Sequence, residues 1–153
     1  MPQIDLFEMT DAQWDDGMAL KFHGAGRLTI QPWDALKSSQ GSVVLMSGNA
    51  AVAAINAAID ALAKAFAEQG IKDGVQVNSV SPGAVMAGRR RAFFEKWAPA
   101  HNLTVEEAIK KFPAQASITR FGKPEEVADL MSYLVSPAAK WMGALPCAWT
   151  AAR

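Results

Sequence analysis

The sequence from Gly41 to Gly83 reads GSVVLMSGNAAVAAINAAIDALAKAFAEQGIKDGVQVNSVSPG and divides into a strand, a helix and a second strand. Residues 42–47 are apolar and rich in β-branched side chains, which is typical of a strand buried on both faces. Residues 50–69 repeat bulky apolar side chains at spacings of three and four, which predicts an amphipathic helix that ends at Gly70. Residues 75–80 form the second strand, which ends at a Ser-Pro-Gly turn. The stretch is therefore predicted to be a βαβ unit with two parallel strands.

The carboxyl ends of the two predicted strands are the expected place for a functional site, because parallel sheets bind ligands at that edge. Those ends are Ser47-Gly48 and Ser81-Pro82-Gly83. The fold class is accordingly α/β, and residues 1–153 have the length of one domain.

The region before the first strand is predicted to be one long helix. A capping box at Thr10-Asp11-Ala12-Gln13 begins it, and apolar spacing continues it to about Lys37. Gly24 and Gly26 lie inside this helix. A phosphate-binding loop is a poor interpretation of these glycines, because no strand precedes them and Thr29 stands where a third glycine is needed. Close packing of a neighbouring helix explains them better.

The region after Gly83 is predicted to contain three more helices. The long segment 84–119 has room for two short helices, the second beginning at Thr104, and such an excursion is typical of a lid over a site. A proline followed by two glutamates at 124–126 begins a further helix that ends near Ser136.

The composition is that of a soluble globular protein, with 50% hydrophobic and 20% charged residues. The formal net charge is zero, which gives no electrostatic reason to expect nucleic acid or an anionic membrane as a partner. The run Arg89-Arg90-Arg91 is the only dense basic cluster. It indicates either a solvated helix face or a contact with an anionic ligand or a partner's carboxylates.

The single cysteine, Cys147, excludes an intramolecular disulfide and is typical of a reducing cytoplasm. The two histidines are far apart, so no metal site is predicted. Residues 1–5 lack the features of a signal peptide, and charged residues interrupt the alanine-rich helix, so no membrane span is expected. The predicted location is therefore the cytoplasm.

Three segments carry a family resemblance when they are taken in order: residues 41–47, residues 77–83, and residues 120–128 before the last helix. Together they resemble the C-terminal half of a short-chain dehydrogenase/reductase over about residues 7–142. The resemblance implies a Rossmann-type sheet and an NAD(P)-dependent oxidoreductase. In that family the Pro-Gly turn and the second residue after it contact the nicotinamide side of the cofactor. The matching residues are Pro82, Gly83 and Val85.

The resemblance also indicates what this sequence lacks. The family's glycine-rich phosphate loop and its first four strands have no counterpart here, so we expect a truncated Rossmann-type fold with a sheet of two strands and three or more long helices. The residue that discriminates NAD from NADP follows the second of those strands. Either cofactor is therefore compatible with the sequence, as is the absence of any bound cofactor.

The family's catalytic positions carry altered residues. In the family, a tyrosine donates a proton and a lysine one helical turn later lowers the pKa of that tyrosine. Aligning the helix places Val52 at the tyrosine position and Asn56 at the lysine position. The substrate-orienting serine aligns with Gly48, or with Ser47 if the register slips by one, and Lys21 stands where a helical asparagine is usual.

Tyr133, the single tyrosine of the sequence, lies in the last predicted helix, where a packing role is expected. The carboxyl end also departs from the family, because residues 143–153 replace its usual last strand. A frameshifted or degenerate gene would account for that departure.

Two functional hypotheses follow. The first is a short-chain family homologue that is inactive alone because its cofactor loop and its Tyr/Lys pair are missing. The second is a non-catalytic module that oligomerises through helices 11–37 and 50–69, or a degenerate gene product. The alanines on the face of helix 50–69 opposite its bulky stripe, at residues 50, 54, 57, 61 and 65, favour close helix packing. An unpaired strand edge at residues 42–47 would favour self-association. The helix faces and the unpaired edge predict a homo-oligomer, whereas the first hypothesis would regain activity either with a separate cofactor-binding half or with a site rebuilt in an oligomer. The substrate class is not indicated by the sequence.

Overall fold

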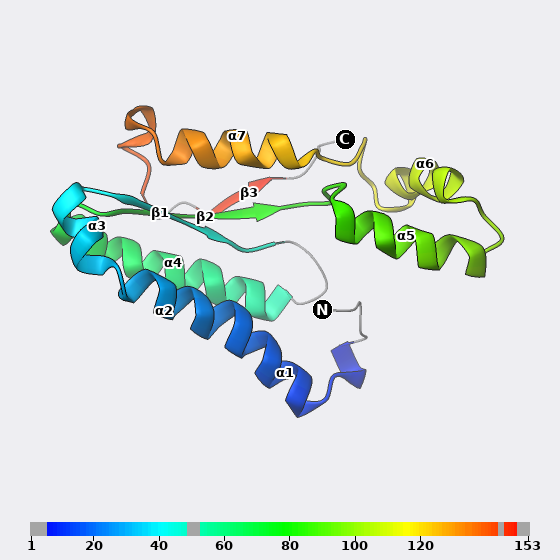
Figure 1. Cartoon of the computed structure of the whole chain (residues 1–153), viewed down its shortest axis with the longest axis horizontal. Helices are drawn as coiled ribbons and strands as arrows, with labels where there is room; N and C mark the ends of the chain where they lie inside the picture. Colours follow the sequence, from blue (N-terminus) through cyan, green and yellow to red (C-terminus); the bar gives the residue numbers. More distant parts are fainter. Residues whose placement is uncertain (1–5, 49–52, 144–145, 150–153) are drawn as a thin grey trace.

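The computed structural model describes residues 6–48, 53–143 and 146–149 (Figure 1). Its helices and strands are, in chain order, η1 (Leu6–Glu8), α1 (Asp11–Gly17), η2 (Met18–His23), α2 (Gly24–Ile30), α3 (Trp33–Ser39), β1 (Ser42–Met46), α4 (Ala53–Asp73), β2 (Gln76–Pro82), α5 (Gly88–Ala100), α6 (Val105–Gln115), α7 (Pro124–Leu134), η3 (Pro137–Ala139) and β3 (Pro146–Trp149). The segment η2 is a π-helix, whereas η1 and η3 are 3₁₀ turns.

The sheet has three described strands, all parallel, in the order β1-β2-β3. Ser42 pairs with Gln76, and the register continues to the pair of Met46 and Val80. The two predicted parallel strands and the α/β class are therefore confirmed. The third strand, β3, was not predicted, and it pairs with the second half of β2. No described strand pairs with the other edge of β1.

Helices cover both faces of the sheet. In Figure 1, α7 lies on one face, and α4 with the helices of residues 11–39 lies on the other. The main core fills the space between α4 and the sheet, because apolar side chains from both point into it. Its buried members are Leu45, Ile59, Ala63, Ala67, Val75 and Val77. Among the described residues, no helix combines the length and the apolar character that crossing a membrane requires.

The predicted helix over residues 11–37 is interrupted. The predicted capping box is present. The backbone N–H of Gln13 donates to Thr10 Oγ1 at 3.4 Å, and the backbone N–H of Thr10 donates to Gln13 Oε1 at 2.9 Å. Helical backbone continues through α1, η2 and α2 to Ile30 and breaks at Pro32, after which α3 begins. Proline has no N–H to donate and its ring clashes with the preceding turn, which explains the break.

The prediction that Gly70 ends the long helix is wrong. Helix α4 runs on to Asp73, and Gly74, with a φ of +73°, provides the left-handed turn into β2. Gly70 is needed for another reason. Its carbonyl accepts from the Val75 N–H at 3.0 Å, and a Cβ at residue 70 would overlap the carbonyl oxygen of Val75. The glycine therefore allows the helix and the strand to approach closely.

The segment 84–119 contains the two short helices that the sequence predicts, α5 and α6. They enclose a second, aromatic core in which Phe94, Ala98 and Ala108 are buried. Figure 1 places this pair of helices beyond the carboxyl end of β2. The pair therefore lies at the edge where a ligand site is expected.

The end of α4 is anchored to α3 by Asp73. The carboxylate of Asp73 accepts hydrogen bonds from Trp33 Nε1 and Gln69 Nε2, each at 2.8 Å, and lies 3.1 Å from the Lys37 ammonium. The Asp73 side chain is 11% exposed. Hydrogen bonds from Gln69, Trp33 and Lys37 hold the pKa of Asp73 at about 2.

Replacing Gly70 by Ala is expected to destabilise the protein, although the same change in an ordinary helix is stabilising. The added methyl group meets the Val75 carbonyl, and such overpacking costs about 1–3 kcal/mol of unfolding free energy. Gly88→Ala is the matched control, because nothing lies within 4 Å of a Cβ at that position. Urea unfolding measures both variants, and equal stabilities would contradict the close approach.

Asp73→Asn is expected to lower the unfolding midpoint at neutral pH. Folding lowers the pKa of Asp73 from its usual value. The contribution of the Asp73 carboxylate to the free energy of unfolding is therefore complete above about pH 4 and is lost as the pH falls toward 2. The difference in midpoint between wild type and variant should therefore shrink over that range. Glu68→Gln, at an exposed position of the same helix, is the control. A difference that does not depend on pH would contradict this role for Asp73.

Candidate functional site

Ser47 links the end of β1 to the start of α4. It follows β1 directly, is 6% exposed, and its N–H donates to the Val80 carbonyl of β2 at 2.8 Å. Its hydroxyl donates to the backbone carbonyl of Asn56 at 2.9 Å. This hydrogen bond gives the buried Ser47 hydroxyl an acceptor and links the first turns of α4 to the carboxyl edge of the sheet.

Asn56 and Lys21 are directly paired. Asn56 is 5% exposed, and its Oδ1 accepts from the Lys21 ammonium at 2.6 Å. Lys21 comes from η2, whose π-helical turn is wider than that of an α-helix and is a geometry often found at functional sites. The structure therefore brings together Ser47, Asn56 and Lys21, the three residues that the sequence nominated for catalytic positions.

The electrostatic environment of Lys21 differs from that of a surface lysine. Partial burial lowers the pKa of the Lys21 ammonium, and the positive charge of Arg89 lowers it further. An ammonium has three donors, and Asn56 takes one of them. Its other donors have no partner among the described residues.

Pro82, Gly83 and Val85, the predicted cofactor contacts, lie where β2 ends and the chain turns toward α5. Pro82 is the last residue of β2 and pairs with Trp149 of β3. Val85 forms a parallel bridge with Gly122, and the two hydrogen bonds of that bridge use the Ala84 carbonyl and the Met86 N–H, both at 2.9 Å. The N–H of Val85 therefore points away from Gly122 and has no partner among the described residues.

The nicotinamide end of NAD(P) presents a carboxamide and ribose hydroxyls. The Val85 N–H can donate to a carboxamide oxygen, and the remaining Lys21 donors can meet hydroxyl or carbonyl oxygens. The carboxyl edge of the sheet thus carries both a backbone donor and a cation.

Sequence reasoning missed a second link between the sheet and α4. The buried Ser81, near the end of β2, has its Oγ 3.4 Å and 3.5 Å from the two carboxylate oxygens of Asp60. Asp60 lies one helical turn after Asn56, so adjacent strand ends contact successive turns of the same helix face. The sequence did contain a signal for this link, because Asp60 follows Asn56 by four residues. That spacing was interpreted only as an interruption of the apolar helix.

The alternative serine position, Gly48, lies against the same amide. A Cβ at Gly48 would stand 3.5 Å from Asn56 Nδ2, an ordinary contact distance. A serine at residue 48 would therefore meet the Asn56 side chain. Val52, the residue at the tyrosine position, lies outside the described residues.

Tyr133 does not belong to this cluster. It lies in α7 and is 45% exposed, and α7 covers the opposite face of the sheet from α4 (Figure 1). Because the sequence contains a single tyrosine, no tyrosine hydroxyl accompanies Lys21 and Asn56.

The arginines of α5 have different surroundings. The Arg90 guanidinium lies over the Phe112 ring, 5.6 Å from its centre, and Arg91 Nε is 3.6 Å from a Glu95 carboxylate oxygen. Arg89 acts on Lys21 through its charge. Within the described ranges, no group of three or more His, Cys, Asp or Glu side chains is placed to hold a metal ion.

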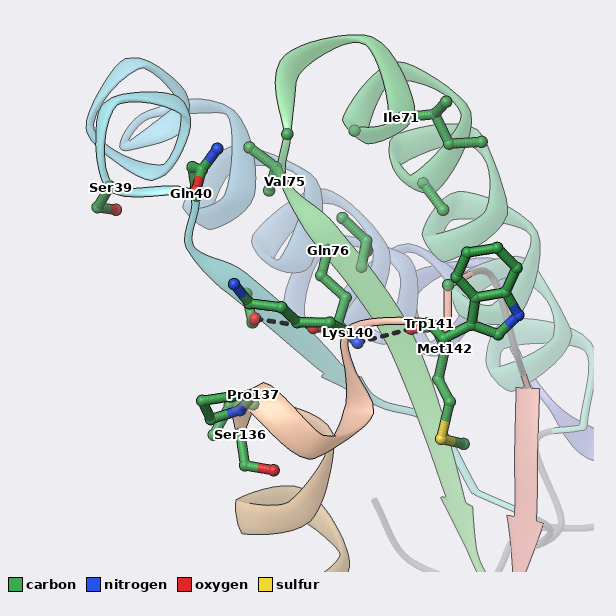
Figure 2. Close-up of a pocket in the computed structure, with 17 residues that line it drawn as sticks. Ser39, Gln40, Ile71, Val75, Gln76, Ser136, Pro137, Lys140, Trp141 and Met142 are labelled. Atoms are coloured by element: carbon green, nitrogen blue, oxygen red, sulfur yellow. Dashed lines mark hydrogen bonds between the residues drawn. The ribbon is translucent and has the colours of Figure 1, made fainter.

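A cavity of about 850 Å³ lies at the other end of the sheet, where the strands begin (Figure 2). The Gln76 amide crosses it and donates to the carbonyls of Ala139 at 2.5 Å and Met142 at 2.6 Å. Lys140 and Trp141 flank the opening. None of the predicted site residues lines this cavity, so it is separate from the cluster at the carboxyl edge.

A parallel sheet covered by helices on both faces, with polar residues at its carboxyl edge, is an arrangement that dinucleotide-binding proteins share with other α/β proteins. A sequence model of the family described as "Enoyl-(Acyl carrier protein) reductase" matches residues 2–144. The chain belongs to the short-chain dehydrogenase/reductase family and is a homologue of its NAD(P)-dependent oxidoreductases.

Individual relatives agree with this assignment. The acetoacetyl-CoA reductase of Synechocystis sp. is 28% identical over 143 residues, which are 86% of this chain and 55% of that relative. This chain therefore spans about half the length of that relative.

Solved structures share the fold. L-sorbose reductase from Gluconobacter frateurii, complexed with NADPH and L-sorbose, superposes with a TM-score of 0.89 at 20% identity, over 96% of this chain and 60% of that one. Actinorhodin polyketide ketoreductase with NADPH superposes with a TM-score of 0.82 at 24% identity, over 95% of this chain and 60% of that one.

Proposed function

We propose that this chain binds the nicotinamide end of NADH or NADPH at the carboxyl edge of its sheet and does not by itself catalyse carbonyl reduction. The site consists of Val85, which offers a backbone donor, and Lys21, which offers a cation. The bound cofactor would supply hydride chemistry, whereas the chain supplies the surface that orients the ring. A cytoplasmic location is part of this proposal, supported by the lone Cys147.

The observation that carries the proposal is the pairing of Lys21 with Asn56. Reduction of a carbonyl needs a proton donor at the oxygen as hydride arrives. The Asn56 amide does not release a proton near neutral pH, and Tyr133 lies on the far face of the sheet. The cluster can therefore bind and orient a ligand but lacks the family's acid.

A fluorescence titration tests this proposal, using energy transfer from the five tryptophans to bound NADH or NADPH. We expect saturable binding with a micromolar Kd, about −8 kcal/mol. Reduced nicotinamide mononucleotide should compete, and AMP should not. A panel of ketones should cause no steady oxidation of the cofactor. Absence of saturable binding, or sustained turnover, would contradict the proposal.

We propose in addition that the chain forms a homo-oligomer through helices 11–37 and 50–69. The observation that favours this is an exposed small-residue face on α4, together with exposed bulky side chains on the neighbouring helices. The exposed residues are Leu20, Leu28, Ile30, Ala54, Ala57, Ala61 and Ala65. Alanine faces let helices approach closely, and exposed leucines beside them add apolar area to such a contact.

Ala61→Glu is expected to dissociate the oligomer, because it places a charge in the close helix contact. Sedimentation velocity should show a loss of mass relative to wild type. Ala114→Glu, at an exposed position of α6, is the matched control and should leave the mass unchanged. A monomeric wild-type protein would contradict this second proposal.

A further inference from the structure

The cavity at the amino edge of the sheet has the size and the lining of a small-molecule site. Its volume is about 850 Å³, and small-molecule pockets have volumes of roughly 300–1,000 Å³. Apolar residues of α4, of the start of β2 and of the segment after α7 form much of its wall: Ala67, Ile71, Val75, Val77, Val135, Pro137, Trp141 and Met142. The cavity is separate from the nicotinamide site proposed above, so a ligand bound here is a second ligand.

Three large apolar residues that line this cavity are exposed to solvent. Ile71 is 84% exposed, Val135 is 52% exposed and Trp141 is 99% exposed. They belong to α4, to the residue that follows α7 and to the loop that leads toward β3, so the fold gathers them from three segments. Exposed apolar side chains that gather at one place mark a binding surface. A ligand of this cavity is therefore expected to have an apolar part.

The Gln76 amide is held by its neighbours and is not free to bind that ligand. Its Oε1 accepts from the Ser42 hydroxyl at 3.1 Å. Its Nε2 donates to the carbonyls of Ala139 at 2.5 Å and Met142 at 2.6 Å. Both polar atoms of the amide are thus used to join the starts of β1 and β2 to the loop after η3. The polar contact of a ligand must come from another side chain.

Helices α4 and α7 both end at this cavity, and free carbonyls at helix ends would favour a cationic ligand. Several of these carbonyls are already bound. The Gly70 carbonyl accepts from the Val75 N–H at 3.0 Å. The Tyr133 carbonyl accepts from the N–H of Ser136 at 3.0 Å and from its hydroxyl at 2.7 Å. These hydrogen bonds weaken the preference of the helix ends for a cation.

Lys140 gives the cavity a preference for an anion. It is the one charged residue among the described residues of the lining. Within the part of the chain that the structure describes, no ion pair or hydrogen bond joins its ammonium to another residue. Asp73, which precedes the lining residue Gly74, lies 3.1 Å from the Lys37 ammonium instead. An ammonium with no carboxylate beside it attracts a negatively charged group.

Figure 2 shows the cation and the largest apolar side chain on opposite sides of one loop, with Trp141 on the side of α4 and Lys140 on the side of β1. A ligand that contacts both needs a charged end and an apolar end. We propose that this cavity binds an amphipathic organic anion, an alkyl or aromatic carboxylate. Lys140 holds the carboxylate, and the apolar part lies against Trp141 and Ile71.

The experiment adds octanoate to the full chain and follows the indole N–H signals of the five tryptophans by NMR. The Trp141 signal, assigned by its loss in Trp141→Phe, should shift in a saturable way. The signal of Trp33, whose Nε1 donates to Asp73, is the internal control and should not shift. Octanol should bind more weakly than octanoate, and octyltrimethylammonium should not saturate the site.

Calorimetric Kd values of variants then separate the two parts of the ligand. Lys140→Met should weaken octanoate binding about fivefold and leave octanol binding unchanged, whereas Lys140→Arg should retain octanoate binding. Trp141→Ala should weaken the binding of both ligands about tenfold, because it removes the apolar surface. Lys110→Met and Phe7→Ala, at exposed positions away from the lining, are the matched controls and should bind octanoate as wild type does.

Three results would overturn the proposal. The first is the absence of a saturable shift at Trp141. The second is equal binding of octanoate and octyltrimethylammonium, or equal octanoate affinity in wild type and Lys140→Met. The third is a lower mass of Trp141→Ala in sedimentation velocity without octanoate binding to wild type, which would identify this face as a contact between copies. None of these results involves NADPH, so the inference and the proposed function fail independently.

Discussion

The central position of β2 is the constraint on which the rest of the structure depends. This strand pairs with β1 on one side and β3 on the other, and its residues 77–81 are buried. A buried strand with polar side chains needs partners for them. Gln76 and Asn78 donate to the Met142 carbonyl, which fixes the loop that leads toward β3. The polar residues of β2 thus determine how the end of the chain joins the sheet.

The same strand positions the candidate site. Parallel pairing brings the ends of β1 and β2 to one edge, where Ser47 meets Asn56 and Ser81 approaches Asp60 on the next turn of α4. These contacts fix the start of α4, and the fixed Asn56 side chain in turn receives Lys21. The site is therefore a consequence of strand order and helix placement, to which the cation of η2 is added.

Local patterns were sufficient to predict the βαβ unit, the capping box at Thr10 and the helices of the segment after β2, because periodicity and caps are properties of neighbouring residues. Gly70 misled the prediction because its role is a close approach to Val75, which is a tertiary contact. Strand β3 is short and begins with proline, so its own residues give little indication of a strand. Its strand conformation comes from pairing with β2. The residues of the cluster could be nominated from the family alignment. Their direct contact could not, because it joins side chains of two different helices that lie 35 positions apart in the sequence.

The most direct test of the account is amide hydrogen exchange, resolved by residue, with and without saturating NADPH. The account predicts slower exchange at Val85, whose N–H faces the proposed nicotinamide site, and at Ser47 and Gly48 beside Asn56. Exchange around the cavity at the opposite edge of the sheet should not change. Protection confined to that cavity, or no protection at Val85, would contradict the account.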